Sequence, residues 1–161
     1  MPPRVPDPLR KVMSPEQAAS WRAGFSGTVV FTNGVFDLLH PGHVDILLAA
    51  RREGDALVVG LNTDGSVRRL KGEGRPVRTT AERAVVLAAL EFVDVVVAFD
   101  DDTPIALVRQ LRPDVLVKGG DYTEATIVGA PEVRSWNGRV VVVPLTPGHS
   151  TTSTIEKLND R

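Results

Sequence analysis

The chain has 161 residues, enough for one domain, and its 19 basic and 20 acidic side chains leave a formal net charge of −1. A domain of this size buries about 70% of the surface of its unfolded chain, so it can fold without covalent cross-links. Cysteine is absent, which excludes disulfides, thiolate metal sites and cysteine nucleophiles. The balanced charge favours neither nucleic acid nor a membrane surface as a partner. Without a secretory signal or a run of about 18 apolar residues, a soluble cytoplasmic protein is expected.

Residues 1–26 are predicted to form an N-terminal arm and a short helix, and residues 27–161 a single domain. The first 13 residues contain four prolines and are expected to be extended. Ser14 followed by Pro15, with Glu16 and Gln17 in the next positions, is typical of a helix start. This helix is predicted to end near Gly24.

Five short apolar runs alternate with helical patterns in the rest of the chain, at residues 28–32, 56–61, 93–99, 115–117 and 139–145. Continuous β-branched runs are typical of strands that are buried on both faces of a parallel sheet. Helical patterns occupy residues 41–52, 80–90 and 103–111, with a short piece after residue 64. A last helix follows residues 150–154, where Ser153 and Glu156 have the spacing of a capping box. The alternation predicts an α/β fold with a doubly wound five-stranded parallel sheet.

Ligands of doubly wound sheets bind at the carboxyl ends of the strands, and the most informative strand end is the sequence TNGVFDLLHPGH of residues 32–43. Asn33 and Gly34 are expected to offer backbone N–H groups in a tight turn, and the helix that starts at Pro41 directs its positive end into the same space. Neither a dinucleotide G-x-G-x-x-G motif nor a Walker motif occurs, so hydride transfer and P-loop chemistry are disfavoured. The segment predicts a phosphate site.

His40 and His43 are three residues apart and therefore share one face of the first helical turn. Gly42 between them removes a side chain that would block a ligand. Such a pair can donate hydrogen bonds to a phosphate, although a histidine at a helix start is often only a cap. The preceding Asn-Gly-Val-Phe-Asp sequence favours the functional interpretation.

Residues 33–43 are similar to the (G/N)-x-F-D-x-x-H-x-G-H signature of the cytidylyltransferase-like nucleotidyltransferase superfamily, and residues 150–155 (STTSTI) resemble its second motif. Further segments resemble the heptose 1-phosphate adenylyltransferases, namely residues 62–64, 70–72, 75–76, 102–104 and 117–122. The resemblance implies a Rossmann-like fold. It also implies that a phosphate oxygen of the sugar phosphate attacks the α-phosphorus of ATP directly, which gives ADP-heptose and pyrophosphate.

The resemblance also implies roles for individual residues. His40, His43 and Lys71 would be catalytic, with Lys71 on a mobile, glycine-flanked loop of residues 70–76. The nucleotide would be bound by Thr32, Asn33, Gly34, Phe36, Gly42, Lys118, Gly119, Asp121, Ser150, Thr151 and Thr152. The sugar phosphate would be bound by Asn62, Asp64 and Arg75.

Asp37 and the acidic run of residues 100–102 are not expected to bind a ligand. Asp37 is expected to be structural and to order the turn by accepting backbone N–H bonds. The acidic run is more typical of favourable charge at a helix start than of a metal site. No metal site on the protein is expected, and Mg²⁺ would be carried by the ATP phosphates and water. His149 stays open between a phosphate contact and an exposed loop residue.

Two other functions stay open. A cytidylyltransferase acting on glycerol 3-phosphate or another polyol phosphate usually carries R-T-E-G-I before the second motif, whereas residues 145–149 are LTPGH, so its arginine is missing. A non-catalytic nucleotide-binding module would not need two histidines and Lys71. The expected partners are a small sugar phosphate and a separate sugar kinase, because the chain has no kinase part; related enzymes often form homodimers.

Overall fold

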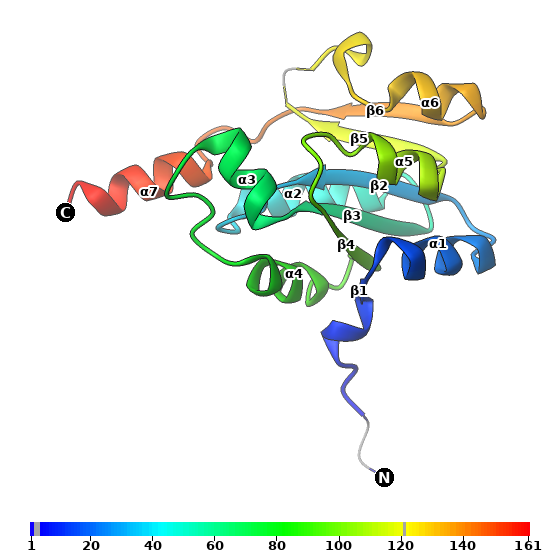
Figure 1. Cartoon of the computed structure of the whole chain (residues 1–161), viewed down its shortest axis with the longest axis horizontal. Helices are drawn as coiled ribbons and strands as arrows, with labels where there is room; N and C mark the ends of the chain where they lie inside the picture. Colours follow the sequence, from blue (N-terminus) through cyan, green and yellow to red (C-terminus); the bar gives the residue numbers. More distant parts are fainter. Residues whose placement is uncertain (2–3, 121) are drawn as a thin grey trace.

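A computed structural model describes Met1, residues 4–120 and residues 122–161 of the chain (Figure 1). Within this part, the strands form one parallel sheet in the order β1-β4-β3-β2-β5-β6. Their bounds are β1 (Val12–Met13), β2 (Val29–Gly34), β3 (Ala56–Asn62), β4 (Val95–Phe99), β5 (Val115–Gly119) and β6 (Arg139–Val143). The predicted α/β fold and parallel sheet are confirmed, but the sheet has six strands instead of five. The extra strand, β1, is two residues of the predicted arm, too short to produce a periodic pattern.

Helices cover both faces of the sheet. They are η1 (Pro8–Lys11), α1 (Pro15–Gly24), α2 (Pro41–Arg51), α3 (Asp64–Lys71), α4 (Thr80–Ala88), α5 (Ile105–Leu111), η2 (Glu124–Thr126), α6 (Ala130–Ser135) and α7 (Thr151–Asn159). One apolar cluster joins buried residues of α1, α5 and α6 to one sheet face, and a second joins α2 and α4 to the other. All seven residues of β3 are buried, as its continuous apolar pattern predicts. None of the helices in the described residues has the length and apolar character that crossing a membrane requires.

The chain changes direction across the sheet between β2 and β5. From β2 it winds outward through β3 to β4, and then returns to place β5 on the other side of β2. The pairing of β2 with β5 extends only to Phe31 opposite Leu116, although both strands continue beyond these residues. The two strands therefore separate toward their carboxyl ends, which is where a doubly wound sheet binds its ligands.

The amino edge of the sheet is closed by aspartates. Asp55, Asp94 and Asp114 accept the backbone N–H groups of Thr28, Leu57 and Val29 at 2.7, 2.8 and 2.8 Å. Asp114 is also paired with Arg22 at 3.1 Å, and Asp94 with Arg51 at 3.2 Å. These carboxylates satisfy backbone groups that the strands leave unpaired at their starts.

Candidate active site

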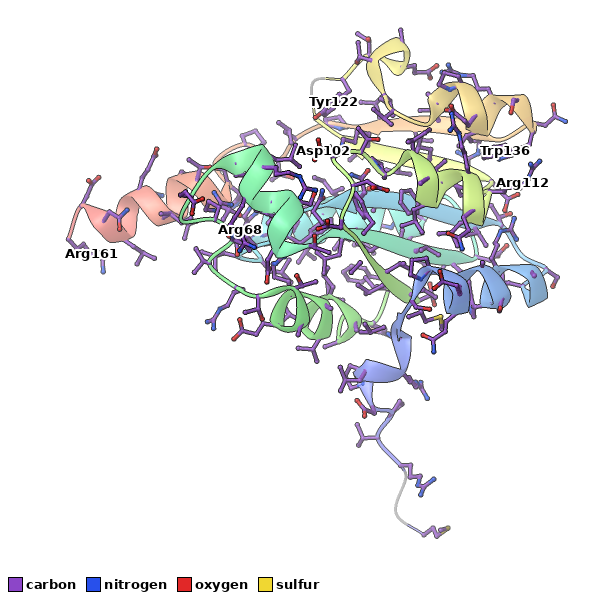
Figure 2. The ribbon with its side chains drawn as sticks, in the orientation of Figure 1. Arg68, Asp102, Arg112, Tyr122, Trp136 and Arg161 are labelled. Atoms are coloured by element: carbon purple, nitrogen blue, oxygen red, sulfur yellow. The ribbon has the colours of Figure 1, made fainter. Side chains whose placement is uncertain are left out.

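A cavity of about 660 Å³ opens at the carboxyl edge, where β2 and β5 separate. Most of the side chains that the sequence analysis selected line it. They are Thr32, Asn33, Gly34, Phe36, Asp37, His40, His43, Asn62, Lys71, Arg75, Lys118, Gly119, Ser150, Thr151 and Thr152. Figure 2 shows Tyr122 and Asp102, which also line the cavity, at this edge of the sheet, and Arg112 and Trp136 at the opposite edge.

The turn that follows β2 begins later than predicted. Asn33 and Gly34 are the last two residues of β2 and pair with Gly60 and Leu61 of β3, so they do not form the turn itself. The backbone turns at Phe36, which has a positive φ of 48°. A Cβ on Gly34 would lie 2.9 Å from the Phe36 ring. Glycine is therefore required here by the close approach of this ring, and not by the backbone angle.

The two predicted histidines lie at the start of α2 with their rings stacked. His40 is the N-cap and His43 the third residue of the helix, and their ring centroids are 3.8 Å apart. The backbone N–H of His40 donates to Nδ1 of the His43 ring at 3.3 Å. Because Nδ1 accepts, a neutral His43 carries its proton on Nε2, which remains a donor.

Burial keeps both rings neutral. It lowers the pKa of His43 to about 4, with a further contribution from the nearby His40. Burial, and then the neighbouring His149, also lower the pKa of His40. The Nδ1 atom of His40 is buried without a hydrogen-bond partner in the described residues. The site therefore holds neutral imidazoles whose hydrogen-bonding capacity is not used up by the protein.

Gly42 does not itself line the cavity, but its lack of a side chain leaves space for the His40 ring. A Cβ at this position would lie 2.9 Å from Cε1 and 3.0 Å from Nδ1 of the His40 ring. The sequence predicts that Gly42 clears the path of a ligand. Its observed effect is to leave room for the His40 side chain.

Two lysines converge on the cavity from different elements. Lys71 is the last residue of α3, not part of a loop as predicted, and Lys118 lies near the end of β5. Burial, followed by repulsion from Lys71, lowers the pKa of Lys118. In the described part of the chain, neither lysine has a carboxylate within 4 Å. Two cations without a counter-ion among the described residues form a site suited to an anion.

The second motif lines the cavity next to the histidine segment. Ser150 caps α7, and its Oγ accepts the Ser153 N–H at 3.0 Å. The predicted capping box at Ser153 and Glu156 is therefore wrong, because the helix begins three residues earlier. Thr151 Oγ1 donates to the Leu38 carbonyl at 3.3 Å, which joins the start of α7 to the histidine segment.

Asp37 and Arg75, which both line the cavity, form an ion pair at 2.9 Å. The Asp37 side chain is completely buried and accepts the N–H groups of Val77 and Arg78 at 2.8 and 2.9 Å. Burial alone would raise the pKa of Asp37, but the hydrogen bonds from Arg78, Val77 and Arg75 outweigh it and lower the pKa. Asp37 thus accepts backbone N–H bonds, but from a segment 40 residues away and not from its own turn.

The remaining predicted residues have different positions. Asn62 is buried and lines the cavity, where its Nδ2 donates to Ser66 Oγ at 3.0 Å. Asp64 does not line the cavity, because its carboxylate accepts from Arg83 at 2.8 Å. Substrate binding by Asp64 stays a prediction. Asp121 lies outside the described residues.

Two residues that the sequence does not assign to the site also line the cavity. His149 lines the cavity, with its ring centroid 6.0 Å from that of His40. Asp102 lines it from the loop after β4, and its carboxylate is held by Arg69 at 2.8 Å. No group of three or more metal-ligating side chains occurs among the described residues.

Comparison with known proteins agrees with this geometry. Residues 31–157 match the model of the cytidylyltransferase-like family. The chain belongs to this family. It is a nucleotidyltransferase, and enzymes of this kind use a nucleoside triphosphate.

Two curated relatives are similar over nearly the whole chain. The bifunctional protein HldE of Acidiphilium cryptum is 57% identical over 93% of this chain, and that of Syntrophotalea carbinolica is 55% identical over 98%. The matches cover 32% and 31% of those proteins, so the chain spans about a third of the length of these relatives.

Solved structures share the fold. The lipopolysaccharide core biosynthesis protein from Thermoplasma volcanium has a TM-score of 0.62 and 26% identity, covering 75% of this chain and 98% of its own. Pantoate-beta-alanine ligase from Francisella tularensis has a TM-score of 0.60 at 17% identity, covering 92% of this chain and 76% of its own. The second likeness concerns the fold alone.

Proposed function

We propose that the protein transfers AMP from ATP to heptose 1-phosphate and produces ADP-heptose and pyrophosphate. The observation that carries the proposal is a single cavity in which two neutral histidines, two lysines without described counter-ions and the hydroxyl groups at the start of α7 all face the same space. The resemblance of five chain segments to heptose 1-phosphate adenylyltransferases supports heptose 1-phosphate as the acceptor substrate. So does the similarity to a protein named for lipopolysaccharide core biosynthesis.

The triphosphate would lie between the histidines and α7. His43 Nε2 and His40 would donate hydrogen bonds at the α-phosphate, and Ser150, Thr151 and Thr152 would hold the β- and γ-phosphates at a helix N-terminus. Phosphate charge would raise the pKa of both rings above their lowered values, so the rings would bind protons more readily as negative charge develops. Lys71 and Lys118 would balance the charge that builds up as pyrophosphate leaves.

The chemical step would be a direct displacement. An oxygen of the sugar phosphate forms a bond to the α-phosphorus, the bond from the α-phosphorus to the bridging oxygen breaks, and pyrophosphate leaves with that electron pair. The protein needs no nucleophile of its own, because positioning and charge stabilisation supply the catalysis. Mg²⁺ would be carried by the phosphates and water, since Asp37 and Asp102 are engaged by Arg75 and Arg69.

Arg75 is the candidate for the sugar phosphate. Its Nε is fixed by Asp37, and its two terminal nitrogens have no hydrogen-bond partner in the described residues. A guanidinium held at one nitrogen presents the remaining N–H groups in a fixed plane, which suits a phosphate. Asn62 lines the same cavity as a neutral hydrogen-bonding group. A separate sugar kinase would supply the sugar 1-phosphate.

A matrix of substrates tests the proposal: ATP, CTP and GTP, each with heptose, hexose and glycerol phosphates, followed by pyrophosphate release. We expect turnover to be fastest with ATP and a heptose 1-phosphate. Turnover with CTP and glycerol 3-phosphate alone would replace the proposal with the cytidylyltransferase alternative. Nucleotide binding without pyrophosphate release for any pair would indicate a binding module.

A further inference from the structure

Arg83, on α4, is a buried cation that the proposed chemistry does not use. Its side chain has no exposed surface, and it lies close to the cavity without lining it. Its N–H groups meet five acceptors, which are the carbonyl oxygens of Val35, Asn62 and Arg78, the Asp64 carboxylate and the Thr80 hydroxyl. The guanidinium is therefore saturated by the protein and has no group left to bind a ligand.

One of these bonds reaches His43 indirectly, through Val35 and Phe36. Arg83 donates to the Val35 carbonyl at 2.8 Å, and Val35 immediately precedes Phe36, where the backbone takes its positive φ. The Phe36 ring meets the His43 ring edge-on, with centroids 5.4 Å apart. Arg83 thus fixes the peptide that sets the direction of Phe36, and Phe36 supports His43.

Other bonds reach the elements that carry the remaining cations. Asp64, paired with Arg83 at 2.8 Å, is the first residue of α3, and Lys71 is the last. The Arg78 carbonyl accepts from Arg83 Nε at 3.0 Å, and the Arg78 N–H bonds to Asp37, which holds Arg75. One side chain therefore connects the histidine turn, the lysine helix and the Arg75 segment.

Stability alone does not account for this residue. A fully buried charge carries a large desolvation penalty, and well-packed apolar residues often stabilise a core as much or more. Arg83 instead donates from one nitrogen to the Val35 carbonyl, directly after β2, and to the Asn62 carbonyl, at the end of β3, and a planar donor with five N–H groups can hold such acceptors in one geometry. Catalytic groups act only when such supporting contacts hold them within a fraction of an ångström.

We infer that Arg83 is a positioning residue for nucleotidyl transfer, which holds His43, Lys71 and Arg75 in their working arrangement. This inference rests on the proposed function. Loss of Arg83 should lower kcat much more than it raises the KM for ATP, because misplacement of catalytic groups weakens the transition state more than the bound substrate.

The test compares Arg83 with a matched arginine at the opposite edge of the sheet. Arg22 also donates to two carbonyl oxygens and one aspartate, those of Phe25, Arg112 and Asp114, but does not line the cavity. Arg83→Met and Arg22→Met are measured for pyrophosphate release at equal folded fractions. We expect kcat to fall about 10²-fold for Arg83→Met with the KM for ATP nearly unchanged, and Arg22→Met to change only the unfolding midpoint. Arg83→Lys, which keeps the charge and three donors, should retain part of the lost turnover.

Equal values of kcat for Arg83→Met and Arg22→Met would overturn the inference. If Arg83→Met does not fold, Arg83→Lys and Asp64→Ala test the inference in its place. Asp64→Ala removes only the link between Arg83 and α3. This variant should lower kcat without raising the KM for the sugar phosphate. If the wild-type protein releases no pyrophosphate with any substrate pair, the proposed function fails, and ring-nitrogen NMR of the three histidines still tests the positioning. The signals of His40 and His43 should shift in the Arg83 variants but not in Arg22→Met. Unchanged signals in all variants would contradict the role.

Discussion

The two edges of the sheet use charge in opposite ways. At the amino edge, Asp94 and Asp114 each combine a backbone N–H with an arginine partner. At the carboxyl edge, Lys71 and Lys118 repel each other across a cavity and have no carboxylate within 4 Å in the described residues. The amino edge has the arrangement expected of a structural element. At the carboxyl edge, a bound anion would relieve the repulsion between the two lysines.

This contrast indicates that the carboxyl edge carries groups that lower the stability of the fold and suit a binding site. Neighbouring like charges and buried imidazoles destabilise a folded protein, and such strain is typical of binding sites. The same parallel strands connect both edges, so a rigid amino edge can support a strained carboxyl edge. Substitutions at the two edges should therefore have opposite signatures, with loss of activity at one and loss of stability at the other.

The largest effect is expected for His43→Ala. Removing a preorganised donor at a developing charge typically costs about 10² to 10³ in rate, and the lowered pKa of His43 shows that the ring is held neutral in the folded protein. Turnover measured by pyrophosphate release should fall by that factor, with little change in the unfolding midpoint. Near-normal turnover would remove His43 from the mechanism.

Lys118→Met should come next. Turnover is expected to fall about 10²-fold through loss of a charge-stabilising donor, while the free energy of unfolding should rise or stay level, because a buried cation beside Lys71 is removed. Chemical denaturation and the pyrophosphate assay measure the two quantities on the same sample. A clear loss of stability would show that Lys118 has a partner that stabilises the fold.

Asp114→Ala probes the opposite edge. The change leaves the Val29 N–H and Arg22 without their carboxylate, and an unsatisfied buried group costs about 1–3 kcal/mol. We expect urea denaturation to show a loss of this size, with kcat unchanged for the remaining folded protein. A selective fall in kcat would break the separation between the two edges.

The last effect is a pH dependence of stability caused by His43. Its folded pKa of about 4 lies below the ordinary value of 6.5, so as the pH falls the unfolded chain takes up a proton before the folded protein does. The free energy of unfolding should therefore decrease between pH 6.5 and about pH 4. Urea denaturation across this range should show a weaker decrease for His43→Gln. Equal slopes for both proteins would show that the ring is not held neutral.

Much of this arrangement can be predicted from the sequence because it depends on local patterns. Continuous β-branched runs identify every strand longer than two residues, and the His40 to His43 spacing places both rings on one helical turn. The two motifs lie after different strands, so the parallel sheet necessarily brings them to the same edge.

Residues whose roles depend on distant partners cannot be predicted in the same way. Arg83 follows an alanine-rich helical pattern and resembles a solvent-exposed arginine, because three of its five acceptors are backbone carbonyl groups that leave no trace in the sequence. The pairing of Asp64 with Arg83 is equally invisible in the sequence, because it forms only when α3 and α4 pack together. Gly72 and Gly74 suggest a loop around Lys71, yet α3 continues to Lys71 before Gly72 ends it.

The second motif has a consequence for the order of synthesis. No residue of α7 is buried, and Figure 1 shows this helix extending away from the sheet. Thr151 lies 113 residues after Leu38, to which its hydroxyl is bonded. A nascent chain that stops before residue 150 would already contain the sheet and both histidines but would lack the hydroxyl groups proposed to hold the outer phosphates. A growing polypeptide would thus bind the nucleotide weakly until α7 emerged from the ribosome.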